Sequence, residues 1–76
     1  MDINKHKEKI GAALRMERRM RELSQDRVGE MSGVAQASVG NLEAGRSSLD
    51  IMYAVALALG MDWAQVTAAA WEVGDE

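Results

Sequence analysis

The segment Gln25–Gly45 constrains the fold of this 76-residue chain more than any other stretch. Apolar residues recur at helical spacing in both of its halves, at Val28, Met31, Val39 and Leu42. Gly33 separates the halves, and glycine takes the left-handed backbone of a tight turn without steric cost. Gly29 lies inside the first half, where glycine costs about 1 kcal/mol relative to alanine, so we expect a second helix to approach closely there. Two short helices joined by a glycine turn are the pattern of a helix-turn-helix.

Helices are also predicted on both sides of this segment. They cover about residues 6–22, 49–59 and 63–72. Asp62 is placed to cap the last of them. Residues 1–5 and 74–76 are expected to be flexible. The 76 residues are therefore predicted to form one all-α domain of five helices.

Several residues are similar, in register, to those of one known family. They are Ile10-Gly11, Leu14-Arg15, Arg18, Leu23-Ser24-Gln25, Gly29, Gly33, Glu43-Ala44-Gly45 and Ala56–Gly60. In this spacing the chain resembles the lambda-type phage repressors and Cro proteins, the Xre-like family, over about residues 8–67. The resemblance implies a lambda-repressor-like DNA-binding domain, with the helix-turn-helix formed by the second and third helices.

The resemblance places the base-reading residues on the third helix, over about residues 36–44. They are Gln36, Ala37, Gly40 and Asn41. Gln and Asn carry a paired donor and acceptor that match N6 and N7 of adenine in the major groove, and an alanine methyl can contact thymine. Because the set has no arginine for guanine, we expect modest specificity or reliance on DNA shape. Ala35 provides no capping hydroxyl, so the start of this helix is expected to be weakly capped.

Two groups of residues are expected to contact DNA phosphates and position the protein without reading bases. They are Ser24 and Gln25 at the start of the second helix, and Arg46, Ser47 and Ser48 after the third. Ser24 is a good N-cap, and the free amides of a helix N-terminus attract phosphate. In the related proteins, the residue at the position of Gln25 commonly braces against the backbone or a side chain of the recognition helix. Ser47 and Asp50 resemble a capping box. The loop around Arg46 is about two residues shorter than is usual in the family.

The related proteins commonly join two positions, here Arg18 and Glu43, in a partly buried ion pair between the first and third helices. The planar fork of arginine can bind a carboxylate with two hydrogen bonds. The family also tends to have a glycine where this chain has Glu22, just after the first helix. Glu22 is expected either to take a strained left-handed backbone or to continue the helix, at a cost of about 1 kcal/mol.

Charge is divided unevenly along the chain. Residues 1–46 hold nine basic and seven acidic side chains, a balance of +2, and residues 47–76 hold none and five, a balance of −5. The two sum to the net charge of −3. DNA responds to the local field more than to the net charge, so we expect the DNA-facing side to be locally basic and the far end to be acidic. The alternative is that these charges are ordinary solvated surface.

The last helix carries two tryptophans and an alanine-rich face. We expect the fourth and fifth helices to form a two-fold dimer interface that leaves the basic side for DNA. The interface residues predicted are Trp63, Val66, Ala70 and Trp71. The alternative for Trp63 is that it completes the core of the monomer.

An enzyme is not expected, because the chain has no cysteine, a lone His6, and no phosphate-binding glycine loop. Neither metal nor cofactor is expected, and no apolar run is long enough to predict a membrane span. The favoured function is a cytoplasmic, homodimeric regulator of a bacterial or phage-infected cell that binds double-stranded DNA at a palindromic operator. A phage or prophage repressor and a restriction–modification controller both fit. The alternative is an antitoxin or adaptor that binds a protein. RNA polymerase and a toxin are the further partners considered.

Overall fold

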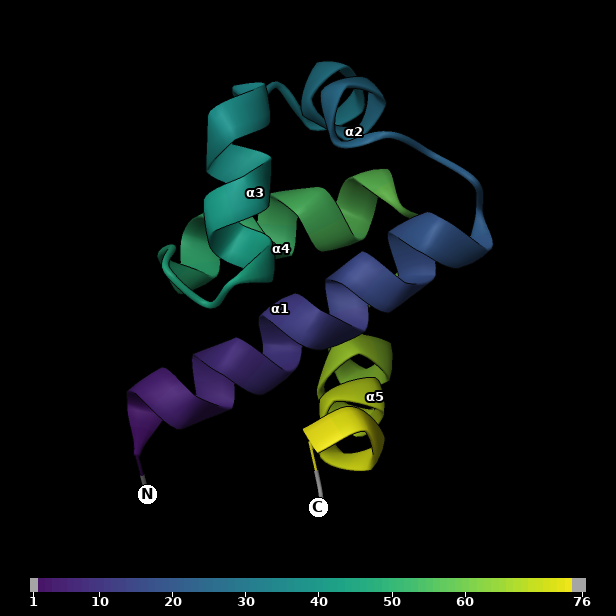
Figure 1. Ribbon diagram of the computed structural model, residues 1–76. Coiled ribbons are helices and arrows are strands. Elements are labelled where there is room, and N and C mark those ends of the chain that lie inside the picture. Colours follow the sequence, from purple (N-terminus) through teal and green to yellow (C-terminus); the bar gives the residue numbers. More distant parts are fainter. Residues whose placement is uncertain (1, 75–76) are drawn as a thin grey trace.

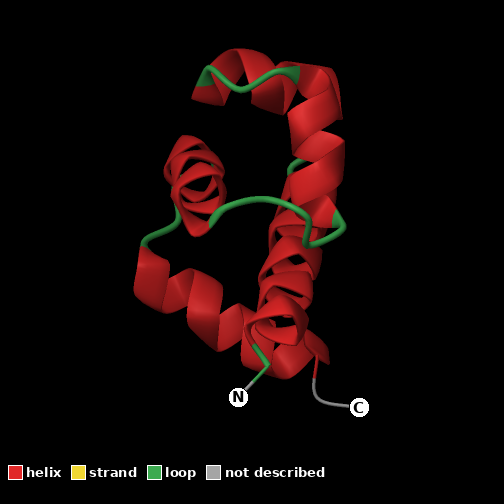
Figure 2. Cartoon of the chain, turned by 90° about the vertical axis from the view of Figure 1, so that its left-hand side faces the viewer, coloured by secondary structure: helices red, strands yellow, loops and turns green. Residues whose placement is uncertain are grey.

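The computed structural model describes residues 2–74, which form five α-helices and no strand. The helices are α1 (Ile3–Met20), α2 (Gln25–Ser32), α3 (Gln36–Glu43), α4 (Leu49–Ala58) and α5 (Trp63–Gly74). Helix α1 runs through the middle of the molecule, with α2, α3 and α4 on one side and α5 across the other (Figure 1). The start of α1 and the end of α5 lie at the same end of the molecule (Figure 2). The prediction of an all-α domain is confirmed.

Every helix contributes apolar side chains to one core. The largest fully buried side chains are Ile10, Leu14, Val28, Val39, Leu42, Met52, Val55, Leu59 and Val66. Helix α1 is buried on two sides, because α3 and α4 cover one face and α5 the other. The core therefore fixes the position of the helix-turn-helix relative to α1.

The first helix begins earlier than predicted, at Ile3 rather than about His6. Asp2 explains the difference, because its carboxylate accepts a hydrogen bond from the backbone N–H of Asn4 at 3.0 Å and caps the helix. Residues 3–5, expected to be flexible, are thus helical. At the other end of the chain, Gly74 closes α5, and residues 75–76 lie outside the described part.

Glu22 lies two residues after the end of α1, in the turn that closes the helix, and has a left-handed φ of 58°. Two backbone hydrogen bonds close the turn there, from Glu22 N–H to the Arg19 carbonyl and from Leu23 N–H to the Arg18 carbonyl. This is the Schellman arrangement, which usually has glycine at the left-handed residue. Of the two alternatives for Glu22, the structure shows the strained backbone, which costs a residue with a Cβ atom about 1 kcal/mol.

The caps of α4 and α5 differ in how well they were predicted. Ser48, not Ser47, caps α4, and its Oγ accepts from the Ile51 N–H at 3.3 Å, so the predicted pairing of Ser47 with Asp50 is wrong by one residue. Asp62 caps α5 as predicted. Its Oδ1 accepts from the Gln65 N–H at 2.8 Å, and its own N–H donates to Gln65 Oε1 at 2.9 Å, which completes a capping box.

Two glycines mark places where backbone packs directly on backbone. A Cβ atom on Gly11 would overlap the Leu42 carbonyl oxygen, so α1 can lie against the end of α3 only with glycine there. A Cβ on Gly29 would lie 2.5 Å from the Val34 carbonyl oxygen and 3.4 Å from the Gln36 nitrogen. The close neighbours of Gly29 are therefore the turn and the first residue of α3, so a second helix approaches there as predicted, with its N-terminal end.

Within residues 2–74, no single helix is long and apolar enough to cross a membrane. Helices α4 and α5 meet the length and composition criteria only as a pair bent by 105°.

Candidate nucleic-acid interface

Helices α2 and α3 are joined by a turn in which Gly33 has a left-handed φ of 75°. The turn leaves one face of α3 open, and Gln36, Ala37 and Asn41 are exposed on it. Ala35 precedes the helix and makes no side-chain capping hydrogen bond, as predicted. Two amide-bearing side chains on an open helix face can present paired donors and acceptors to a polar edge.

Gly40, also predicted to read bases, is half-buried on this face. The side-chain amide of Gln25 lies over it, with Oε1 3.6 Å from where a Cβ of residue 40 would stand. Nε2 of Gln25 donates to Glu43 Oε1 at 3.1 Å. Gln25 thus braces against a side chain of α3 and fills space that a larger residue at position 40 would occupy.

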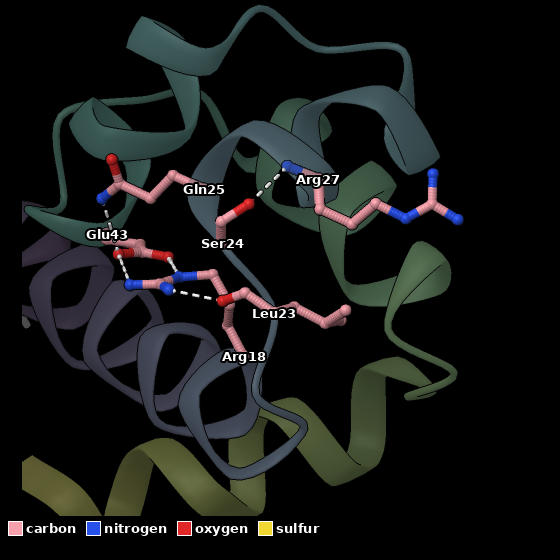
Figure 3. A network of polar contacts seen from close by, with 6 residues as sticks. All are labelled: Arg18, Leu23, Ser24, Gln25, Arg27 and Glu43. Carbon is pink, nitrogen blue, oxygen red and sulfur yellow. Dashed lines mark hydrogen bonds and ion pairs between the residues drawn. The ribbon is translucent and has the colours of Figure 1, made fainter.

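Arg18 and Glu43 form an ion pair between α1 and the end of α3 (Figure 3). The Arg18 Nε donates to Glu43 Oε2 at 2.6 Å, and Nη2 donates to Oε1 at 3.2 Å. A third donor, Nη1, binds the Leu23 carbonyl at 2.7 Å. The two side chains are only 11% and 6% exposed, respectively. Together with Gln25, this network holds α3 at a set angle to α1.

The residues predicted to contact phosphates lie at two helix starts and one loop. The exposed Ser24 caps α2, where its Oγ accepts from the Arg27 N–H at 3.0 Å and keeps its hydroxyl hydrogen free to donate elsewhere (Figure 3). Arg46 and Ser48 are exposed in the segment between α3 and α4, and Ser47 is half-buried there. Each exposed group could donate to an anion.

Two arginines that were not assigned to the site from the sequence lie beside it. Arg15 and Arg19 line a shallow pocket of about 180 Å³ whose other walls include Gln25, Gly40 and Ala44. Both are exposed residues of α1. The basic character of residues 1–46 was the signal available in the sequence, but it does not say which cations reach α3.

The predicted dimer interface needs correction at two residues. Val66 and Ala70 are 0% and 1% exposed, because they pack in the monomer core between α5 and α1. Trp63 is half-buried against that core and meets the Tyr53 ring edge to face at a centroid distance of 5.6 Å. Trp71 is 61% exposed, with Lys9 Nζ 5.1 Å from its ring centroid. Of the four residues predicted for the interface, therefore, only Trp63 and Trp71 present surface to a partner.

A different apolar surface is open on α4. Its members lie four residues apart and are Leu49, Tyr53 and Leu57. We call them the α4 stripe. Leu49 and Tyr53 line a surface depression of about 420 Å³ with Asp50 and Trp63. The described part of the chain also contains no group of three side chains able to hold a metal ion.

Comparison with known proteins gives two matches and one negative result. A helix-turn-helix family model matches residues 14–66. The crystal structure of the clp gene regulator ClgR from C. glutamicum is similar over 91% of each chain, with 31% sequence identity and a TM-score of 0.81. A search of curated protein sequences finds no match.

Proposed function

Because this chain belongs to the Xre- and Cro-like helix-turn-helix family of DNA-binding transcription regulators, we propose that it binds a palindromic operator as a homodimer. The observation that carries this proposal is the open face of α3. Gln36 and Asn41 are exposed on a helix that the Arg18–Glu43 pair holds firmly against α1. A helix of this kind reads base edges in the major groove.

In the proposed complex, Gln36 and Asn41 contact adenine edges and Ala37 contacts a thymine methyl. Gly40 lets the backbone of α3 approach the bases, with the Gln25 amide beside it. Few direct contacts are available on this face, so we propose that DNA shape contributes to site selection.

Phosphate contacts come from Ser24 and the start of α2 on one side and from Arg46, Ser47 and Ser48 on the other. The hydroxyls of Ser24 and Ser48 accept from backbone N–H groups and can donate to phosphate oxygens at the same time. These contacts orient α3 in the groove without selecting bases.

The dimer is proposed to form through the α4 stripe together with Trp63. Leu57 is 54% exposed and Tyr53 is 45% exposed, and three apolar residues on one helical face favour burial against a second copy. Aromatic residues are enriched at such interfaces. A two-fold axis would place the two α3 helices on half-sites about one helical turn apart, roughly 34 Å.

The experiment is selection from a random DNA pool by the purified protein, at low salt and near physiological salt, with light scattering to measure the mass in solution. An enriched inverted repeat that survives the higher salt, bound by a species of twice the chain mass, is the expected result. Enrichment of a single half-site by a monomer would refute the dimer. No enrichment at all, with co-purification of a toxin-like protein, would favour the antitoxin or adaptor alternative.

A further inference from the structure

We infer that Arg15 and Arg19 of α1 bind the phosphates of the DNA strand that passes alongside α3. They would add two cations from α1 to the contacts made by the start of α2, whose Gln25 lines the same pocket, and by the loop after α3. The inference rests on the proposed entry of α3 into the major groove. It assigns a role to a surface that the helix-turn-helix itself does not include.

The first support is where the two side chains lie. Arg15 and Arg19 are four residues apart, so they project from the same face of α1 one turn apart. The pocket that they line also includes Gly40 of α3 and Ala44, the C-cap residue of that helix. Gly40 belongs to the proposed base-reading face, which would enter the major groove of DNA. A DNA strand at the edge of that groove would then pass the mouth of this pocket.

The second support is the charge that remains available. Three of the six arginines of the chain are held in ion pairs, in which Arg18, Arg21 and Arg27 bind Glu43, Glu17 and Glu30, respectively. No ion pair within the described residues includes Arg15, Arg19 or Arg46. In the pocket the charge of Arg18 is balanced by Glu43, which leaves the two guanidinium groups of Arg15 and Arg19 uncompensated.

The third support is the short segment after α3. Arg46 is its one cation, and the two serines that follow carry no charge. Backbone affinity for DNA comes mainly from cations that neutralise phosphates. Because guanidinium binds phosphate with two parallel hydrogen bonds, two free arginines beside α3 would add to the binding that Arg46 provides.

An acidic protein partner is the competing occupant of these arginines. The outer face of α1 also forms a depression of about 440 Å³ lined by Ala12, Arg15, Met16, Arg19 and Met20. A protein would bury the exposed methionines along with the arginines, because flexible methionines suit protein-binding surfaces. DNA would use only the arginines, since a phosphate backbone gives a methionine side chain no favourable contact.

The test compares Arg15→Gln/Arg19→Gln with Arg21→Gln on the DNA site selected by the wild-type protein. Arg21 is a matched control because it is exposed as the C-cap residue of the same helix but is paired with Glu17. Each phosphate contact makes the slope of log K against log salt more negative by about 0.9. The double variant should therefore reduce the magnitude of the slope by about 2 per protomer. It should also weaken binding to cognate and random DNA alike. Arg21→Gln should leave the slope unchanged.

Thermal melting of each variant checks the fold, which neither arginine is expected to support. Wild-type binding with an unchanged slope in the double variant would overturn this inference and leave the proposed function standing. Failure of the wild-type protein to bind DNA would overturn both. If Met16→Ser and the double variant both keep full DNA binding but lose a co-purifying acidic protein, that protein is the occupant and the inference is wrong.

Discussion

Two nitrogens of Arg18, in the last turn of α1, donate hydrogen bonds to the carboxylate of Glu43 at the end of α3. The N···O distances are 2.6 and 3.2 Å. Both side chains are nearly buried. The third hydrogen bond of Arg18, to the Leu23 carbonyl, ties the same group to the segment that leads into α2. One guanidinium therefore sets the position of both helices of the helix-turn-helix relative to α1.

Removing one member of this ion pair should lower the free energy of unfolding more than removing both members. Arg18→Ala and Glu43→Ala are each expected to lower the free energy of unfolding by about 3 kcal/mol, because each leaves a buried charge without its partner. The double variant should lose less than either single variant, because no buried charge is left alone. Urea unfolding of all four proteins measures the coupling. Additive losses would show that the two side chains do not depend on each other.

Glu22→Gly should stabilise the protein by about 1 kcal/mol, because glycine accepts the left-handed φ of 58° that a side chain resists. The gain is reduced by the greater freedom of glycine in the unfolded chain. The melting temperature reports the change. Glu22→Ala is the matched control, since it removes the same charge but keeps the Cβ atom, and it should give no comparable gain.

Alanine should have opposite effects at two helical glycines. Gly11→Ala is expected to lower the free energy of unfolding by about 1–3 kcal/mol, because its Cβ would overlap the Leu42 carbonyl oxygen and push α1 away from α3. Gly40→Ala should raise it by about 0.5–1 kcal/mol, because its Cβ meets only ordinary contacts, at 3.6 Å or more, with Gln25. Chemical denaturation distinguishes the two. Equal destabilisation would contradict the packing described.

Gln36→Ala should weaken binding to the selected site by about 1–3 kcal/mol and relax the preference at one base position. Arg46→Ala should instead weaken binding to all sequences and lower the salt slope by about one. Fluorescence anisotropy with cognate and random duplexes separates the two effects. A loss from Gln36→Ala that is the same on random DNA would remove it from the base-reading set.

Leu57→Glu should shift the protein towards the monomer, because it places a charge in the proposed α4 stripe without disturbing the core. Sedimentation equilibrium gives the dimerisation constant, and half-site binding should replace operator binding. Met31→Glu, a change at an exposed methionine of α2, is the control. A dimer that tolerates Leu57→Glu would have to use another surface, such as that around Trp71.

Local signals in the sequence were sufficient for the helices and most of their ends. Ser24, Gly33 and Asp62 act through residues two to four positions away, so their roles as caps and turn can be predicted without the fold. The same holds for the exposed face of α3, which follows from helical spacing once Val39 and Leu42 are assigned to the core.

Contacts between distant segments needed the tertiary structure. Apolar periodicity marked Val66 and Ala70 as one face of α5, but only the packing on α1 shows that the monomer itself buries that face. In the same way, the sequence revealed four basic residues near the end of α1, and the crossing of α1 with α3 brings three of them, Arg15, Arg18 and Arg19, beside Gly40.

The sequence by itself thus determined the helix-turn-helix and the exposed face of α3, because these depend on spacing along one helix and on the chemistry of single caps. The tertiary structure decided which apolar residues stay exposed and which cations lie beside α3. These depend on how far apart residues distant in sequence come to lie, and the packing of α1 between α3 and α5 sets those distances.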